Sequence, residues 1–175
     1  MELNKQDAVL VAAWVATVMI RIGLVIAWIG AFFGLVINLF WLTVSLSGFP
    51  DVPPSAGDDA GIVVVLFVSL VALGLITGFF NRLAQIIRTV GKGDPFIPEN
   101  ARRLHWMACH ALSAQVLAIV LAALAGWIGQ DVAPRVIQAL YGFWLGGLIL
   151  SLTLFVLARV FRKGTEMREE LEGTV

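Results

Sequence analysis

Two histidines have the side chains in this sequence best suited to binding a metal ion or a haem iron. They are His105 and His110, five positions apart in an apolar stretch. On a helix of 3.6 residues per turn this spacing separates them by about 140°, so the pair cannot comfortably ligate one ion. A homodimer could supply a second His110, and that alternative stays open. Otherwise we expect no cofactor, an interfacial position for His105 and a bond between helices for His110.

The other residues capable of chemistry form weaker patterns. Asp51, Asp58 and Asp59 could hold a divalent cation, but a solvated acidic loop is the simpler interpretation. Cys109 is the single cysteine, which excludes an intrachain disulfide and a cysteine metal cage. The chain has no phosphate-binding glycine loop, H-E-x-x-H helix or G-x-S-x-G elbow. We therefore predict that the protein is not an enzyme.

The amino-acid composition indicates the class of protein whose elements must position these side chains. Hydrophobic residues make up 59% of the chain and charged residues 14%, and the mean hydropathy is +0.91. A soluble domain has about 45–50% apolar and about 25% charged residues. A chain of 175 residues cannot hide so much apolar surface from water, so we predict an integral membrane protein in contact with the lipid bilayer. The net charge of zero argues against direct binding of nucleic acid.

Four apolar stretches follow from the hydropathy pattern. Residues 62–80, 104–127 and 136–158 each have about the 17–25 residues that a helix needs to cross a bilayer. A fourth stretch covers residues 8–47. We predict an all-α, polytopic membrane protein, a four-transmembrane-helix bundle in a single membrane domain (1–175), with helices at about 8–47, 62–90, 98–127 and 135–171.

The first apolar stretch is too long for one crossing. Its 40 residues would extend about 60 Å as a helix, whereas the hydrocarbon core is about 30 Å thick. In one interpretation residues 8–20 lie on the membrane or extend beyond it, and residues 22–41 cross. In the other, two helices fold back at Arg21. We prefer the first, because no proline or Asn-Gly pair breaks the chain there.

The positive charges predict the orientation. With four spans, all of the 12 lysines and arginines except Arg135 fall on the side that holds both chain ends. Cytoplasmic loops carry the excess of Lys and Arg, so both termini are predicted to be cytoplasmic. A fold at Arg21 would put Lys5 on the opposite side, which is a further argument against the hairpin.

Small residues recur at the four-residue spacing typical of helix packing in membranes. Such pairs form grooves in which another backbone can approach closely. We expect helix packing of this GxxxG kind at Gly30, Gly34, Gly74, Gly78, Gly142 and Gly146. The pattern leaves open whether one groove also faces a second protomer in a homo-oligomer.

The predicted spans contain no Asp, Glu or Lys at mid-membrane depth. Ion-coupled transporters usually need such groups. This absence makes transport the less favoured function. The alternative function is an oligomeric small-molecule or lipid transporter or channel, and it would need one continuous polar path. The side chains available for that path are Asn38, Thr77, His110, Gln115 and Gln138.

Two charged segments lie on the predicted cytoplasmic side. In the turn after the second helix, Pro98 and Glu99 suit the first turn of the next helix. After the last span, Arg159, Arg162 and Lys163 precede a run rich in glutamate. A capped turn and a solvated helix end explain these segments more simply than a dedicated docking site.

The same two segments resemble a known family. Residues 93–104, Gly-Asp-Pro-Phe-Ile-Pro-Glu-Asn-Ala-Arg-Arg-Leu, look like the signature of the bacterial membrane proteins catalogued as domain of unknown function 2975. Residues 161–171, Phe-Arg-Lys-Gly-Thr-Glu-Met-Arg-Glu-Glu-Leu, are similar as well. The resemblance covers the second helix to the C-terminus. It implies a multi-pass, four-helix protein of the bacterial inner membrane, often encoded beside a small helix-turn-helix regulator.

These observations lead to one functional hypothesis. We expect a protein that tethers a cytosolic or membrane partner, such as a small helix-turn-helix regulator, through its cytoplasmic segments. The candidate partner-binding residues are Gly93, Pro95, Phe96, Glu99, Asn100, Arg103, Glu166 and Glu170.

Overall fold

The computed structural model describes the backbone of residues 5–47, 56–93, 95–128 and 133–172, and the side chains of residues 8–47, 60–93, 95–124 and 144–171. In this part of the chain the protein is all-helical, as predicted. Its helices are α1 (Lys5–Leu46), α2 (Ala56–Gly91), α3 (Pro98–Ile128) and α4 (Ala133–Glu172). All four are long and apolar enough to cross a membrane, which indicates a multi-pass membrane protein.

Helix α1 is continuous from Lys5 to Leu46, so the alternative with a hairpin at Arg21 is wrong. Its 42 residues extend about 63 Å, roughly twice the thickness of the hydrocarbon core. The cause is local: this segment has no proline, and a single exposed arginine does not interrupt the backbone hydrogen bonds. Residues 8–20 therefore prolong α1 and do not form a separate element.

Helix α2 begins at Ala56, earlier than the predicted start at residue 62. Asp58 and Asp59, which the sequence placed in an acidic loop, belong to the first turn of this helix. Carboxylates near a helix N-terminus favour helix formation. Their side chains, like Asp51 and the prolines of residues 48–55, lie outside the described residues, so the cation alternative there stays untested.

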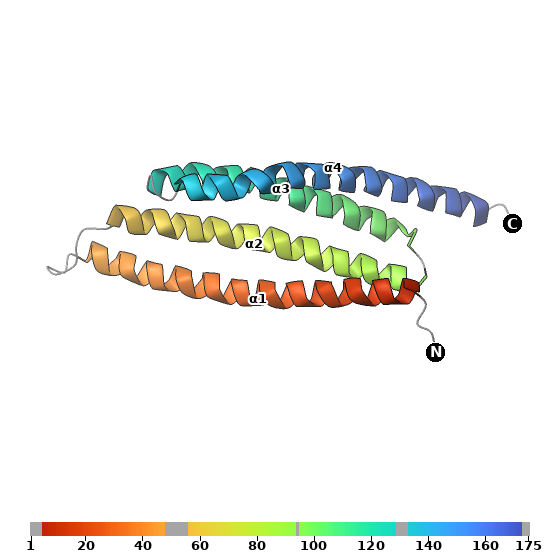
Figure 1. Ribbon diagram of the computed structural model, residues 1–175, viewed down its shortest axis with the longest axis horizontal. Helices are drawn as coiled ribbons and strands as arrows, with labels where there is room; N and C mark the ends of the chain where they lie inside the picture. Colours follow the sequence, from red (N-terminus) through yellow and green to blue (C-terminus); the bar gives the residue numbers. More distant parts are fainter. Residues whose placement is uncertain (1–4, 48–55, 94, 129–132, 173–175) are drawn as a thin grey trace.

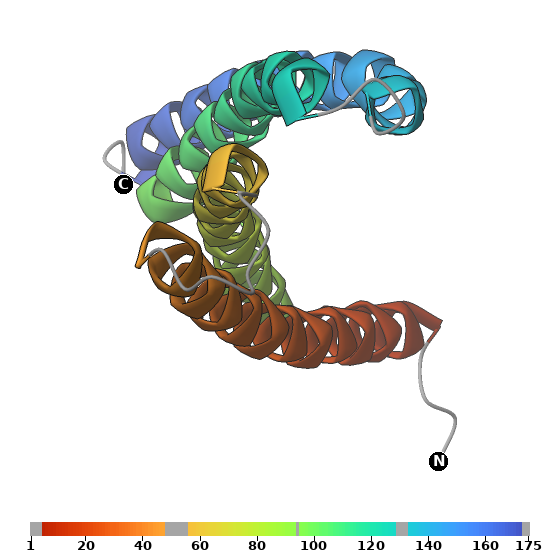
Figure 2. The same cartoon turned by 90° about the vertical axis from the view of Figure 1, so that its left-hand side faces the viewer.

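The helices pack in chain order. Among the described residues, α1 contacts only α2, α2 contacts α1 and α3, and α4 contacts only α3. Seen from one end, they follow a curved line that leaves α1 and α4 apart (Figure 2). The bundle is therefore open, and most apolar side chains of α1 remain exposed to the surroundings, where lipid would cover them.

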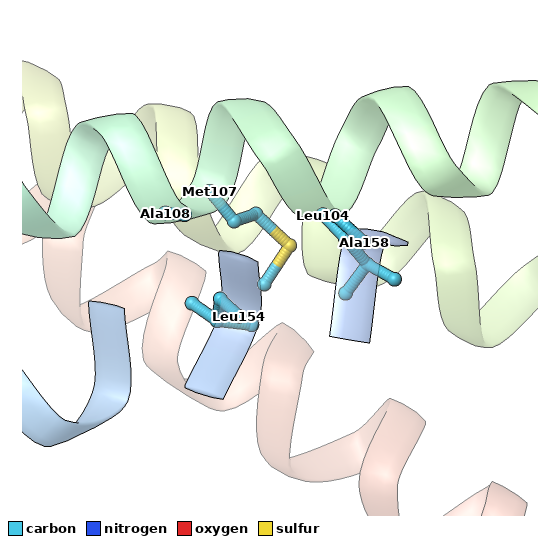
Figure 3. Close-up of a cluster of buried hydrophobic side chains, with 5 residues drawn as sticks. All are labelled: Leu104, Met107, Ala108, Leu154 and Ala158. Atoms are coloured by element: carbon cyan, nitrogen blue, oxygen red, sulfur yellow. The ribbon is translucent and has the colours of Figure 1, made fainter. Parts of the chain in front are cut away.

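The buried core lies between α3 and α4 (Figure 3). Leu104, Met107 and Ala108 of α3 meet Leu154 and Ala158 of α4, and all five are less than 10% exposed. Partly buried side chains extend this cluster to α2 and along α4, namely Phe79, Leu83, Ile86, Phe155 and Phe161. The core thus sits in the half of the molecule that contains the α2–α3 turn. The start of α1 and the end of α4 lie at this same end (Figure 1).

Candidate functional site

The α2–α3 turn closes with backbone hydrogen bonds. The N–H of Lys92 donates to the carbonyl of Thr89 at 3.1 Å, and that of Gly93 donates to Val90 at 3.0 Å. Gly93 has a φ of +87°, a left-handed conformation that glycine adopts without strain. The glycine therefore ends α2 and allows the chain to reverse towards α3.

Asn100 holds this turn from inside. Its side chain is 0% exposed although it lies in the first turn of α3. Its amide nitrogen donates to the hydroxyl of Thr89 at 2.8 Å and to the carbonyl of Pro95 at 2.9 Å. Its amide oxygen accepts a hydrogen bond from Arg103 Nη1 at 2.8 Å. One buried carboxamide therefore joins α2, the turn and α3.

Arg103 extends the network to a second point on α2. Its Nε donates to Gln85 Oε1 at 3.1 Å while its Nη1 donates to Asn100. The guanidinium group thus links a side chain of α2 to a side chain of α3. Such charge-assisted bonds are stronger than neutral ones, so Arg103 positions the turn and is only partly available to a partner.

Phe96 connects the turn to α4. Its ring lies 5.2 Å from the ring of Phe161, centroid to centroid. A Cβ at Gly164 would lie 2.8 Å from Phe96 Cδ1, so the glycine leaves the space that the ring occupies. Phe96 as a whole nevertheless remains 42% exposed. The turn and the end of α4 thus form one surface, which we call the platform: Gly93, Pro95, Phe96, Glu99, Asn100, Arg103, Glu166 and Glu170.

The platform residues divide into internal and exposed ones. Asn100 is enclosed, Arg103 is half-buried, and the half-buried Pro95 contributes a carbonyl acceptor to the network. Gly93, Phe96 and the three glutamates are exposed. Glu166 pairs with Lys163 at 3.4 Å, an exposed i,i+3 contact that adds little stability. The platform can therefore offer a partner one aromatic edge and several carboxylates.

The comparison with protein families covers nearly the whole chain. A family model described as a protein of unknown function (DUF2975) matches residues 6–175. The chain belongs to the DUF2975 family. The resemblance in residues 93–104 and 161–171 is confirmed, and the match also includes α1, where the sequence showed only hydropathy. No curated protein and no solved structure matches the chain.

This DUF2975 protein has a second polar cluster, which the sequence did not reveal. Arg82 of α2 is half-buried and points to α3. Its Nη1 lies 3.3 Å from His110 Nε2, and its guanidinium carbon lies 5.7 Å from the centroid of the Trp106 ring. His110 Nδ1 lies 2.7 Å from the Trp106 carbonyl. His110 thus donates from Nδ1 and accepts the arginine proton at Nε2, which fits the predicted bond between helices.

The two histidines of the DUF2975 chain remain apart. His105 stacks edge-on against Phe155 of α4 with ring centroids 5.4 Å apart, whereas His110 turns to α2. No group of three His, Cys, Asp or Glu side chains suitable for a metal ion occurs among the described residues. Within one chain, the histidines therefore bind different neighbours.

The proposed polar path is divided among helix pairs. Asn38 donates to the carbonyl of Gly34 in its own helix, and Thr77 accepts a hydrogen bond from the Trp28 indole of α1. His110 and Gln115 line a common pocket of about 220 Å³ among α2, α3 and α4, whose accessible lining is apolar. The Gln138 side chain lies outside the described residues. Among the described residues, the side chains proposed for that path therefore share only this pocket.

The predicted packing glycines have different surroundings. A Cβ at Gly78 would lie 2.6 Å from His110 Nε2, and those at Gly34 and Gly74 would make ordinary contacts with side chains of the neighbouring helix. Gly30 and Gly146 have open space, and the surroundings of Gly142 lie outside the described residues. Among the glycines whose surroundings are described, the tightest approach is at Gly147, which the prediction omitted. There the Gln115 side chain fills the space of a Cβ.

Proposed function

We propose that this DUF2975 protein is a non-enzymatic protein of the bacterial inner membrane that tethers a soluble cytosolic partner at the platform. The partner that fits best has a basic docking surface. A small helix-turn-helix regulator is one such protein, because DNA-binding domains carry clustered Lys and Arg.

The orientation is the first support for this proposal. The platform lies at the end of the molecule that holds the start of α1 and the end of α4 (Figure 1). With four crossings, every lysine and arginine except Arg135 lies on that side. An excess of positive charge close to the ends of the spans marks the cytoplasmic side. The platform is thereby expected to face the cytosol.

The connection between the turn and α4 carries the proposal. The Asn100 network and the Phe96–Phe161 contact hold two distant segments of the chain as one preformed surface. A preformed surface loses less conformational entropy when a partner binds. Its exposed carboxylates, including Glu99 and Glu170, complement a basic partner.

The experiment uses charge reversal at exposed positions, so that the internal network stays intact. Full-length protein is crosslinked in its native membranes, solubilised and purified, and the recovered proteins are identified by mass spectrometry. The test variant is Glu99→Lys with Glu170→Lys. The matched control is Asp59→Lys in the first turn of α2, at the opposite end of that helix.

The proposal requires one soluble protein with a basic surface that is recovered with the wild type and the control and lost with the double variant. When the binding is repeated with that protein in purified form, the wild type and the control must again bind it and the double variant must not. Recovery of the same proteins from all three samples, or of no soluble protein from the wild type, would show that the platform does not tether a partner.

A further inference from the structure

A pocket of about 410 Å³ lies between α3 and α4, beside the platform. Its charged lining comes from one face of each helix: Arg102 and His105 of α3, and Arg162, Glu166 and Glu169 of α4. Residues spaced by three or four positions share a helix face, so both sets point into the same groove. The volume is within the range of about 300–1,000 Å³ for small-molecule sites.

The charges in this pocket are ordered along the helix axis. Arg162 lies four positions after the apolar stretch of residues 136–158, at the depth where the membrane interface is expected. Glu166 and Glu169 come about 6 Å and about 10 Å further along the axis, away from the membrane. On α3, Arg102 precedes the apolar stretch of residues 104–127, and His105 lies at its start. Positive groups therefore lie nearer the membrane, and negative groups lie nearer the aqueous phase.

The charged groups are only weakly engaged within the protein. Arg102, Arg162 and Glu169 form no hydrogen bond or ion pair with another described residue. Within the described part of the chain, Glu166 has only its exposed contact with Lys163. Four charges gathered in one groove therefore retain their capacity to bind a charged ligand.

We propose that this pocket binds the headgroup of an aminophospholipid from the adjacent leaflet. In such a lipid the phosphate lies next to the acyl chains and the primary ammonium group lies further out. Arg102 and Arg162 would hold the phosphate, because guanidinium groups bind phosphate oxygens in a bidentate manner. Glu166 and Glu169 would accept hydrogen bonds from the ammonium group. The order of charges in the lipid thus matches the order in the pocket.

The apolar surface beside the pocket suits the rest of such a lipid. Leu112 lies seven positions after His105 on the same face of α3 and is 43% exposed. On α4, Leu152 is 59% exposed, and it precedes Phe155, the residue that contacts the His105 ring. An acyl chain descending from the pocket would therefore meet apolar side chains.

The test measures lipid binding to the full-length protein by native mass spectrometry, with phosphatidylethanolamine, phosphatidylglycerol and phosphatidylcholine of identical acyl chains. Phosphatidylglycerol lacks the amine, and phosphatidylcholine has a cation without N–H donors. We expect the wild type to prefer phosphatidylethanolamine over both by about tenfold. Equal binding of the three lipids would overturn the proposal.

Two double variants test the basic and the acidic half of the pocket independently. Arg102→Gln with Arg162→Gln should weaken binding of all three lipids. Glu166→Gln with Glu169→Gln should abolish the preference for the amine and leave phosphatidylglycerol binding intact or stronger. The matched controls are Arg159→Gln and Arg88→Gln, exposed residues that do not line the pocket. Test variants that behave like these controls would contradict the proposal.

Soluble phosphoethanolamine identifies the source of the headgroup. We expect no displacement of bound lipid by an excess of this compound, because it lacks the acyl chains. If it displaces the lipid efficiently, the ligand is a soluble zwitterion and the lipid assignment is wrong. All of these variants change only exposed side chains. Thermal unfolding of each variant distinguishes loss of lipid binding from loss of the fold.

Discussion

The amide nitrogen of Asn100 lies 2.8 Å from the hydroxyl of Thr89, across the turn between α2 and α3. The two residues are eleven positions apart, and Thr89 also donates to the Ile86 carbonyl at 2.8 Å. The last turns of α2 and the first turn of α3 are therefore fastened to each other by side chains. The geometry of the turn depends on this pair as well as on the backbone bonds of Lys92 and Gly93.

Replacing Asn100 by alanine should destabilise the protein by about 1–3 kcal/mol, because the carbonyl of Pro95 and the hydroxyl of Thr89, both half-buried residues, lose a partner. Equilibrium unfolding in detergent measures the change. Glu99→Ala is the control, since Glu99 is exposed and adjacent in sequence. Equal stability of the two variants would show that the network is not needed to hold the turn.

Gly147→Ala should destabilise the contact between α3 and α4 by about 1–3 kcal/mol, because the new methyl group meets the Gln115 side chain. The neighbouring change, Gly146→Ala, enters open space and should be neutral or stabilise the helix by about 0.5–1 kcal/mol. Unfolding in micelles compares the two. Adding Gln115→Ala to Gly147→Ala should remove the clash. Failure of that second change to restore any stability would contradict the assigned contact.

Thr77→Val should weaken the association of α1 with α2 by about 0.6–1.7 kcal/mol. The Trp28 indole donates to Thr77 Oγ1 at 3.1 Å, and valine keeps the shape while removing the acceptor. Thr153→Val is the matched control, since the described bond of Thr153 is to the Ile149 carbonyl of its own helix. The measurement is the stability of each variant in detergent. Identical losses in both would indicate that the indole contributes no bond between the helices.

Gly164→Ala should expose the α2–α3 turn to proteolysis. The added Cβ would lie 2.8 Å from Phe96 Cδ1, so the ring must move away from Phe161. Trypsin cleavage after the exposed Lys92, followed by mass spectrometry, should become several times faster. Gly23→Ala enters open space on α1 and should leave the rate unchanged. An unaltered rate in Gly164→Ala would mean that the ring contact does not restrain the turn.

Hydropathy was sufficient to predict four long helices, because a segment that crosses lipid must be apolar over its whole length. The same uniformity conceals which face of a helix packs inward. For this reason Gly146 and Gly147 could not be distinguished from the sequence. Only the structure shows that the Gln115 side chain meets the second of these glycines.

The sequence singled out the two segments that the structure brings into contact, but not the contacts between them. Proline and glycine identified the turn, and the charges identified the end of α4. The burial of Asn100 could not be predicted, because an asparagine in a first helical turn is equally consistent with an exposed polar residue. The position of Arg82 could not be predicted either. A cation near the end of a membrane-spanning helix is expected at the lipid headgroups, yet His110 on the neighbouring helix offers Arg82 an acceptor. Both cases depend on which helices become neighbours.

The packing of helices in chain order has a consequence for biogenesis. Each helix after α1 finds an interface on the helix that was synthesised immediately before it, and none of the described contacts requires a later helix to return to an earlier one. Membrane insertion and tertiary assembly can then proceed together, one hairpin at a time, during translation. The last hairpin, α3–α4, contains most of the buried core. The nascent protein would thus form these buried contacts once α4 has followed α3 into the membrane.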